Sequence, residues 1–373
     1  MALRWFFIIR KVCLFALFGI SLSYPQKSGQ SLDQQNIDGL NGVSISAQWF
    51  LSYQYGEQQA KNYNSFLLKR GYVNIKKKFN DRISARITPD VSVDGEGDGR
   101  GDIEMRLKYC YIRYGLKDLP GLTNPYFEFG VVHRPWLEYE QHINDYRVEG
   151  TMFLERVGIL NSADYGITFV TLLGEEMDEP FQQNISHSYP GRYGSFSVGV
   201  YNGGGYHAVE ENENKSVETR LSIRPLPDAI PGLQLSYHGV IGKGNKAASP
   251  DWRLNTGFLS WQHQYFVATA TYFKGTGNSS GSYVDNQGNA LQLDGYSFFT
   301  ELKPVTKWSV IFRYDKLRFS GFQPDHTGSR WIGGIAYHFM NHSKFLLNYD
   351  HFDISNGFDK PQSRFEIAVE LRY

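Results

Sequence analysis

The sequence has only two cysteines, Cys13 and Cys110, in 373 residues. Cys13 lies in an N-terminal apolar stretch that we expect to be removed, so one thiol would remain, and a single thiol cannot form an internal disulfide. The two cysteines also lack the close spacing of a metal-binding pair. The sequence therefore predicts neither a disulfide framework nor a cysteine-based metal centre.

A net charge and long apolar runs are missing as well. Lysine plus arginine and aspartate plus glutamate both number 38, so no overall field favours nucleic acid as a partner. After the N-terminal stretch, no segment approaches the roughly 20 consecutive apolar residues of a membrane-spanning helix. What the sequence does contain is 38 glycines and 16% aromatic residues. That composition suits twisted strands and turns better than helices.

The first 23 residues have the layout of a secretory signal. Basic residues precede an apolar run over 12–22, and Ser23 is a small residue at which cleavage can occur. We therefore predict a signal peptide over 1–23, a short periplasmic segment over 24–42 and a folded body over 43–373. A retained membrane anchor is the alternative, because the apolar region is near the lower limit of about 17 residues for a span.

Apolar and polar residues alternate with a period of two through most of the remaining sequence, which is the pattern of β-strands. We predict about sixteen strands, at 43–55, 66–79, 82–93, 103–114, 126–134, 164–173, 194–202, 217–224, 233–241, 254–261, 265–273, 294–302, 308–317, 330–339, 344–352 and 364–373. Their length suits the 9 to 11 or so residues of a tilted membrane-crossing strand. The predicted fold is all-β: a transmembrane antiparallel β-barrel of about 16 strands. A soluble β-sandwich is the alternative.

The predicted links alternate in length. Links after even-numbered strands are mostly short, and links after odd-numbered strands are mostly long and polar. Outer-membrane barrels have short periplasmic turns and long external loops, so the rhythm favours a barrel over a sandwich. The long link at 174–193 breaks the rhythm and raises the question of a misplaced strand.

The two faces of the predicted strands differ in chemistry. In the fourth strand the apolar set, which we expect to face lipid, is Met105, Leu107, Tyr109 and Tyr111; the opposite set is Glu104, Arg106, Lys108 and Cys110. In the eighth strand the two sets are Val217, Thr219, Leu221 and Ile223, and Glu218, Arg220, Ser222 and Arg224. Charges are costly towards lipid and cheap in a water-filled lumen. The charged set is therefore predicted to face the lumen.

The stretch that begins at Pro135 and ends at Ala163 is a long, charged interruption between the fifth and sixth strands. A large barrel needs one long loop to narrow its channel if passage is to be selective. We predict that this third loop folds inward, with Arg147, Glu149 and Arg156 as constriction candidates. An external loop over the barrel mouth is the alternative.

Several short runs resemble the phosphate-selective porin O and P family. They are KRGYVNI (69–75), ISAR (83–86), LKYCYIRY (107–114), FGVVHRPW (129–136), GVYNG (199–203) and RLSIRP (220–225). The resemblance implies a sixteen-stranded outer-membrane barrel, usually a homotrimer, with an inward third loop and a basic lumen that conducts anions. Outer-membrane lipid and small anions would be its partners.

Alternation places a set of cations on the side away from lipid: Arg70, Arg82, Arg86, Arg106, Lys108, Arg134, Arg220 and Arg224. Arginine binds phosphate through a fixed fork of donors, so this set is a candidate pore lining for anions such as phosphate. Asp90, Glu104, Glu128 and Glu218 share the face and weaken the inference. General diffusion of small hydrophilic solutes is accordingly the main prediction, and anion preference is the finer one.

Two other function classes are kept for comparison. A non-conducting adhesive barrel could bind a partner through an external loop such as 274–293. An outer-membrane hydrolase could use Ser236 and His238, two residues apart on one strand, but the sequence shows no oxyanion group beside them. The histidines lack the spacing of a zinc helix. We predict no enzyme activity, no metal and no cofactor.

The last strand alternates from Phe365 to the aromatic Tyr373. We predict that it closes the barrel against the first strand and that its aromatic end is recognised by the barrel-assembly machinery. The predicted location is the bacterial outer membrane, reached by signal-dependent export.

Overall fold

The structure is a computed structural model that describes residues 41–373 apart from 59–60, 96–98, 321–324, 341 and 355–360. The predicted signal peptide lies outside the described residues. So does the predicted periplasmic segment, except for Asn41 and Gly42.

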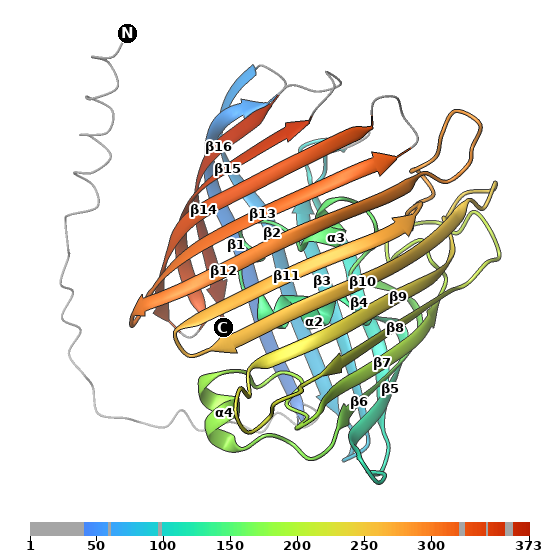
Figure 1. The fold of residues 1–373 in the computed structure, drawn as a ribbon, viewed down its shortest axis with the longest axis vertical. Helices are drawn as coiled ribbons and strands as arrows, with labels where there is room; N and C mark the ends of the chain where they lie inside the picture. The colour runs from blue at the N-terminus through green and yellow to red at the C-terminus, as the bar shows by residue number, and fades with distance from the viewer. Residues whose placement is uncertain (1–40, 59–60, 96–98, 321–324, 341, 355–360) are drawn as a thin grey trace. The chain divides into compact units, whose positions relative to one another are not determined.

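The described chain contains sixteen strands in the predicted order (Figure 1). They are β1 (Val43–Gln58), β2 (Lys61–Lys78), β3 (Ile83–Val93), β4 (Ile103–Gly115), β5 (Leu122–His133), β6 (Ala163–Leu173), β7 (Gly194–Tyr201), β8 (Ser216–Ile223), β9 (Leu233–Lys243), β10 (Asp251–His263), β11 (Phe266–Thr276), β12 (Gln292–Val305), β13 (Trp308–Ser320), β14 (His326–Met340), β15 (Ser343–Ile354) and β16 (Gln362–Arg372). Three short helices lie in two of the links: α2 (Leu137–Ile143), α3 (Phe153–Arg156) and α4 (Glu179–Asn184). Within the described ranges, no helix is long and apolar enough to cross a bilayer.

The sheet closes on itself. Each strand pairs antiparallel with its neighbours in sequence, and β1 pairs with β16, where Trp49 faces Leu371 and Tyr55 faces Phe365. A closed sheet leaves no strand edge with unpaired backbone groups. The predicted sixteen-stranded antiparallel barrel, closed by its first and last strands, is confirmed, and the β-sandwich is excluded.

The two faces of the wall follow the alternation in most strands. In β8, the side chains of Val217, Leu221 and Ile223 are 41–46% exposed on the outside, whereas Glu218 and Arg220 are fully buried on the inside. An apolar exterior with a polar interior is what lipid outside and water inside require.

The alternation of β4 breaks at Lys108. The register of β3 against β4 skips this residue, which forms a β-bulge. The extra residue turns the rest of the strand over, so Tyr109 and Tyr111 line the lumen and Cys110 is exposed on the outside. The expectation that the two tyrosines face lipid and the cysteine faces the lumen is therefore wrong, although Leu107, before the bulge, faces outward as predicted.

Most of the links show the predicted rhythm, although β1 and β2 are separated by only two residues. The links from β10 to β11 and from β12 to β13 have two residues each, 264–265 and 306–307, whereas those from β7 to β8 and from β11 to β12 span 202–215 and 277–291. The exceptional link 174–193 contains α4 and no strand, so its length is a real feature of the barrel.

Deleting the stretch from Phe365 to Tyr373 should prevent barrel formation, because it removes the partner of β1 and leaves two strand edges open. We expect no heat-modifiable band on gels and no protein in the outer-membrane fraction. The substitution Tyr373→Ala is the control, because it keeps the β1–β16 pairs and tests the terminal aromatic alone. Normal insertion of the deletion variant would contradict closure by β16.

Candidate functional site

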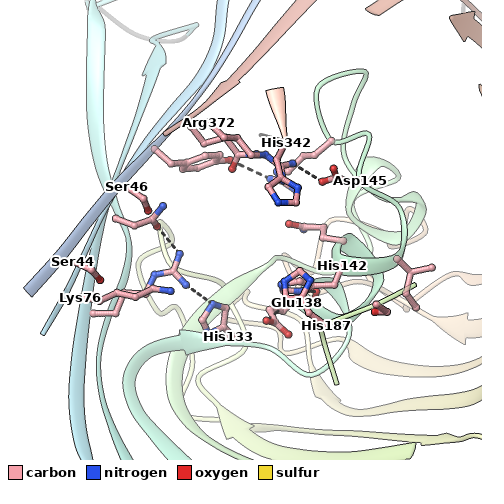
Figure 2. A pocket seen from close by; sticks show the side chains of 18 of the residues that line it. Ser44, Ser46, Lys76, His133, Glu138, His142, Asp145, His187, His342 and Arg372 are labelled. Carbon is pink, nitrogen blue, oxygen red and sulfur yellow. Dashed lines mark hydrogen bonds and ion pairs between the residues drawn. The ribbon is translucent and has the colours of Figure 1, made fainter. Parts of the chain in front are cut away.

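A cavity of about 1830 Å³ opens inside the barrel at the rim that carries the even-to-odd links. Strands β1 to β5 line one side of it, and the ends of β12, β13, β14 and β16 line the other. Residues of α2 and of the link 174–193 also reach it (Figure 2). A solute could enter the barrel through this cavity.

Basic side chains dominate this cavity. Eleven of the lining residues are lysine or arginine and four are aspartate or glutamate. The basic ones are Lys76, Lys77, Lys78, Arg82, Arg86, Lys108, Arg113, Arg147, Lys303, Lys307 and Arg372; the acidic ones are Asp81, Glu138, Asp145 and Glu301. Because the whole chain has no net charge, the fold concentrates positive charge at this opening.

Arg86 is bound on this wall by neutral groups. Its guanidinium donates to Asn74 Oδ1 at 2.6 Å and to Thr88 Oγ1 at 2.9 Å. It also lies 3.1 Å from Nε2 of His133 and 4.6 Å from the centre of the Tyr109 ring. Within the described chain it forms no ion pair, so its charge acts on the cavity.

Lys108 lies deeper and is 4% exposed. Its Nζ donates to Tyr72 Oη at 3.3 Å and lies 4.5 Å from the centre of the Tyr72 ring. Arg147 donates to the same hydroxyl at 3.4 Å and to Glu155 at 2.7 Å. Burial lowers the pKa of Arg147, but the Glu155 carboxylate outweighs it and raises that pKa well above its ordinary range. Lys108 and Arg147 thus form a fixed cationic pair beside the cavity.

The segment between β5 and β6 packs against the wall through apolar side chains. Trp136, Leu137 and Ile143 are buried in a cluster with wall residues that include Phe258. The Trp136 ring meets the Phe258 ring edge to face at 5.1 Å. This burial of large side chains fixes α2 and its flanks against the strands.

Polar contacts join the same segment to strands far away in the sequence. Asp145 accepts from Lys344 of β15 at 2.8 Å and from Arg372 of β16 at 2.5 Å. Tyr146 donates to Glu301 of β12 at 2.7 Å. Burial raises the pKa of Asp145, but the two cations outweigh it and hold that pKa below its ordinary range. The segment therefore contacts strands opposite to the ones it connects.

The second half of the segment joins a buried ionic cluster. Arg156 lies 3.5 Å from Asp315 and 3.9 Å from Glu149, which is itself 3.9 Å from Arg313. Burial, followed by repulsion from Arg313 and Arg330, lowers the pKa of Arg156 to about 9. These separations are longer than direct hydrogen bonds, so the contacts within the cluster are ion pairs.

The link 277–291 holds the end of the segment. Tyr283 Oη donates to the carbonyl of Val157 at 2.5 Å, and Asn278 donates to the carbonyl of Gly158 at 2.9 Å. The backbone N–H of Ser279 donates to Ile159 at 3.0 Å. The first part of this link, which the adhesive hypothesis would offer to a partner, is thus bound to the segment, while 286–289 are exposed.

The predicted pore-lining cations fall into three groups. Arg82, Arg86 and Lys108 line the cavity, as does Arg147. Arg70 and Arg106 lie on the inner wall beyond it, where Arg70 pairs with Asp90 at 3.0 Å and Arg106 with Glu104 at 3.2 Å. Arg134, Arg220 and Arg224 do not line the cavity; nor do Glu149 and Arg156.

Arg134 and Arg220 are completely buried. Arg134 binds Glu218 through two hydrogen bonds of 2.9 and 3.1 Å. Arg220 donates to the carbonyl of Pro135 at 3.0 Å and packs against the rings of both Tyr139 and Tyr189, at 4.2 and 4.7 Å. These arginines fix the segment and the link 174–193 to the wall and do not face open space.

Sequence reasoning overlooked the run from Lys76 to Lys78 and the lysine at position 69. The run lies at the end of β2 and lines the cavity; three consecutive lysines before a turn are the signal that could have shown it. Lys69 faces inward because the register of β1 against β2 skips it. Its Nζ donates to Glu366 at 2.6 Å and to the carbonyl of Val148 at 2.5 Å.

The hydrolase hypothesis finds no support in the geometry. Ser236 Oγ is 2.8 Å from Ser222 Oγ and 3.0 Å from Tyr139 Oη, whereas His238 faces Glu218 at 3.5 Å and stacks on Trp136. Neither residue reaches the cavity. In the ranges that the structure covers, no group of three or more histidine, cysteine, aspartate or glutamate side chains is arranged to hold a metal ion.

Three histidines approach one another at the opening. His142 comes from α2, His187 from the link 174–193 and His342 from the turn before β15 (Figure 2). Burial lowers the pKa of His187, and repulsion from the other two adds to the effect, while Asp145 opposes it. His187 is therefore protonated at lower pH than an ordinary histidine.

Acidification should strengthen the positive field of this opening, because His187 gains a charge when it is protonated. We expect the ratio of anion to cation permeability, measured from reversal potentials, to rise between pH 7.5 and pH 5. The variant His187→Asn should show a smaller rise. An unchanged pH dependence in the variant would exclude His187 as a source of the rise.

Glu140 of α2 should destabilise the fold at neutral pH. Burial raises its pKa to about 7, although Arg313 opposes the shift. Its ionised form is thus disfavoured in the folded protein, and stability falls as pH rises from about 4.5 to 7. Replacing Glu140 with Gln should raise the free energy of unfolding at pH 8 by up to about 3 kcal/mol and leave it almost unchanged at pH 4. Urea titrations at both pH values measure this, and an equal effect at both would refute it.

Comparison with known proteins gives structural matches only. No known protein family matches the sequence, and no curated protein does. The fold is similar to OmpF of Salmonella typhi in complex with daunomycin (TM-score 0.58, 8% identity, 89% of this chain and 97% of that chain). It is also similar to the anion-selective porin of Comamonas acidovorans (TM-score 0.58, 9% identity, 89% of this chain and 99% of that chain). A further match is the trimer form of OmpT, an outer membrane protein of Vibrio cholerae (TM-score 0.55, 13% identity, 89% of this chain and 99% of that chain). At these identities the likeness shows the fold: a transmembrane β-barrel of the kind found in outer-membrane porins.

Proposed function

We propose that this protein is an outer-membrane porin for passive diffusion of small hydrophilic solutes, with a preference for anions. The observation that carries the preference is the cavity lining, with eleven basic residues against four acidic ones in a chain without net charge. The barrel fold shared with outer-membrane porins supports the channel itself.

The path for anions follows β2 to β4. Lys76, Arg82, Arg86 and Lys108 line the cavity and form no ion pair in the described chain. Positive charge on a low-dielectric wall raises the local concentration of anions. Phosphate is the finer proposal, because arginine and lysine donors that neutral groups hold in place suit its oxygen atoms.

The segment between β5 and β6 is the proposed constriction. Its contacts with β2, β12, β15 and β16 support an inward fold across the lumen. Arg147 and Lys108 would stand at the narrow passage, while Glu149 and Arg156 would brace the loop against β13.

The proposal also includes the oligomeric state of the protein and its insertion into the outer membrane. The trimer form of a similar barrel supports a homotrimer, and the exposed apolar outer face suits outer-membrane lipid. Recognition of the last strand by the barrel-assembly machinery, and export through the N-terminal signal, belong to the same proposal.

The proposal is tested by conductance of the purified protein in planar bilayers under a salt gradient. We expect open channels with a reversal potential of anion-selective sign. The double variant Lys76→Glu and Arg82→Glu should move the reversal potential towards zero, because it lowers the excess of basic over acidic lining residues from seven to three. The variant Lys246→Glu, in an external loop where Lys246 pairs with Glu211, is the control and should behave as the unmodified protein.

The outcomes separate the two parts of the proposal. Folded protein without any conductance would refute the porin function. Conductance with cation preference would refute the anion preference alone. Chloride current that phosphate reduces at low concentration would support the phosphate proposal, and equal currents in its presence would contradict it.

A further inference from the structure

A groove of about 750 Å³ lies on the outer surface of β9 to β12. Its floor is Gly257, where the space that a side chain would occupy is open. Leu235, Leu259, Tyr272 and Phe298 form its walls, each with 43–56% of its surface exposed. The groove is apolar and faces whatever surrounds the barrel.

Cationic side chains lie just beyond one end of this groove. Gly257 faces Tyr272 on β11, and Asn255, two residues nearer the link 244–250, faces Lys274. Residues two apart on a strand share a face and lie about 7 Å apart. Lys274 and Arg253 therefore project from the same outer face as the groove, on the side of the long links.

Strand β13 adds two more cations at the same level. Lys316 faces Tyr296, a groove residue, and Arg318 faces Asp294. Arg318 pairs with Asp294 at 2.7 Å, and Arg253 lies 3.8 Å from Asp251. Lys274 and Lys316 form no ion pair within the described ranges. The four cations, Arg253, Lys274, Lys316 and Arg318, thus keep positive charge that Asp251 and Asp294 do not neutralise, and an external anion could bind to it.

Elsewhere the outer face is different. The charged residues of β6 to β8, Asp164, Glu218 and Arg220, are all buried inside, and the exposed residues of these strands are apolar, such as Ile167 and Val200. Cations on a lipid-facing wall are costly near the bilayer centre and tolerated near its interface. Four of them beside an apolar groove call for a ligand with a matching anionic head and apolar tail.

We propose that the groove and these four cations bind an outer-leaflet glycolipid that carries phosphate groups and several acyl chains. One acyl chain lies along Gly257, one phosphate lies against Arg253 and Lys274 on β10 and β11, and a second phosphate lies nearer Lys316 on β13. The choice of leaflet rests on the proposed function, in which the long links face the cell exterior. Arginine and lysine recognise the phosphate, and the apolar walls exclude water from the chain.

Native mass spectrometry of the detergent-purified, full-length protein tests the site with three probes: bisphosphorylated lipid A, its dephosphorylated form, and phosphatidylethanolamine. We expect bisphosphorylated lipid A to bind most tightly. Each of the substitutions Arg253→Gln and Lys274→Gln should weaken its binding about fivefold. Gly257→Leu should abolish binding by filling the groove.

Gly333→Leu is the matched control. Gly333 faces Phe312 of β13 and Tyr349 of β15, and a side chain there also meets open space. Both leucine variants should fold, as heat-modifiable gel mobility reports, and only the one at position 257 should lose the lipid.

Three results would overturn the site: equal binding of the phosphorylated and dephosphorylated lipids, equal binding by the two leucine variants, or a disulfide between two copies of a Gly257→Cys variant in native membranes, which would make this face an interface between subunits. Conductance in planar bilayers is measured in a separate experiment and tests the porin function. Lipid binding by a barrel that passes no current would refute the porin function and leave the lipid site standing.

Discussion

The pairing of β1 with β16 is the constraint on which the rest of the structure depends. Backbone groups in a bilayer have no water to bind, so a sheet there is stable only when every strand has two neighbours. Closure fixes which face of each strand is inside. From that point the chemistry of the lumen follows from the alternation, because charges that lipid would reject have only the interior to occupy.

The interior divides this charge unevenly. Between β12 and β16 most cations have carboxylate partners, as in the pair of Arg330 with Asp350. On β2 to β4, Arg86 and Lys108 are held by amide, hydroxyl and aromatic groups instead. A neutral chain thereby acquires a positive wall, and the asymmetry arises from the choice of partners rather than from the number of charges.

Sequence patterns predicted the strand number, the order of strands and the rhythm of the links, because these depend on local alternation and turn chemistry. They failed where one residue is added to a strand. The bulges at Lys69 and Lys108 change which residues face inward, and the backbone pairing that creates them involves neighbouring strands.

The candidate site was predictable only in part, for a related reason. Alternation correctly placed Arg86 and Arg220 on the inner face. It could not show that Pro135 and the rings of Tyr139 and Tyr189 cover Arg220 while Arg86 stays at the cavity. Which inward residues remain accessible is decided by the packing of one long segment, and that packing joins residues up to 227 positions apart.

The contacts of that segment also imply an order of assembly. Asp145 is held by Lys344 and Arg372, and Val148 by Lys69 beside Glu366. Half of these partners belong to the last strand to be synthesised. These contacts of the segment between β5 and β6 can therefore form only after the final hairpin has docked, whereas its contacts with β8 and β10 need no later strand.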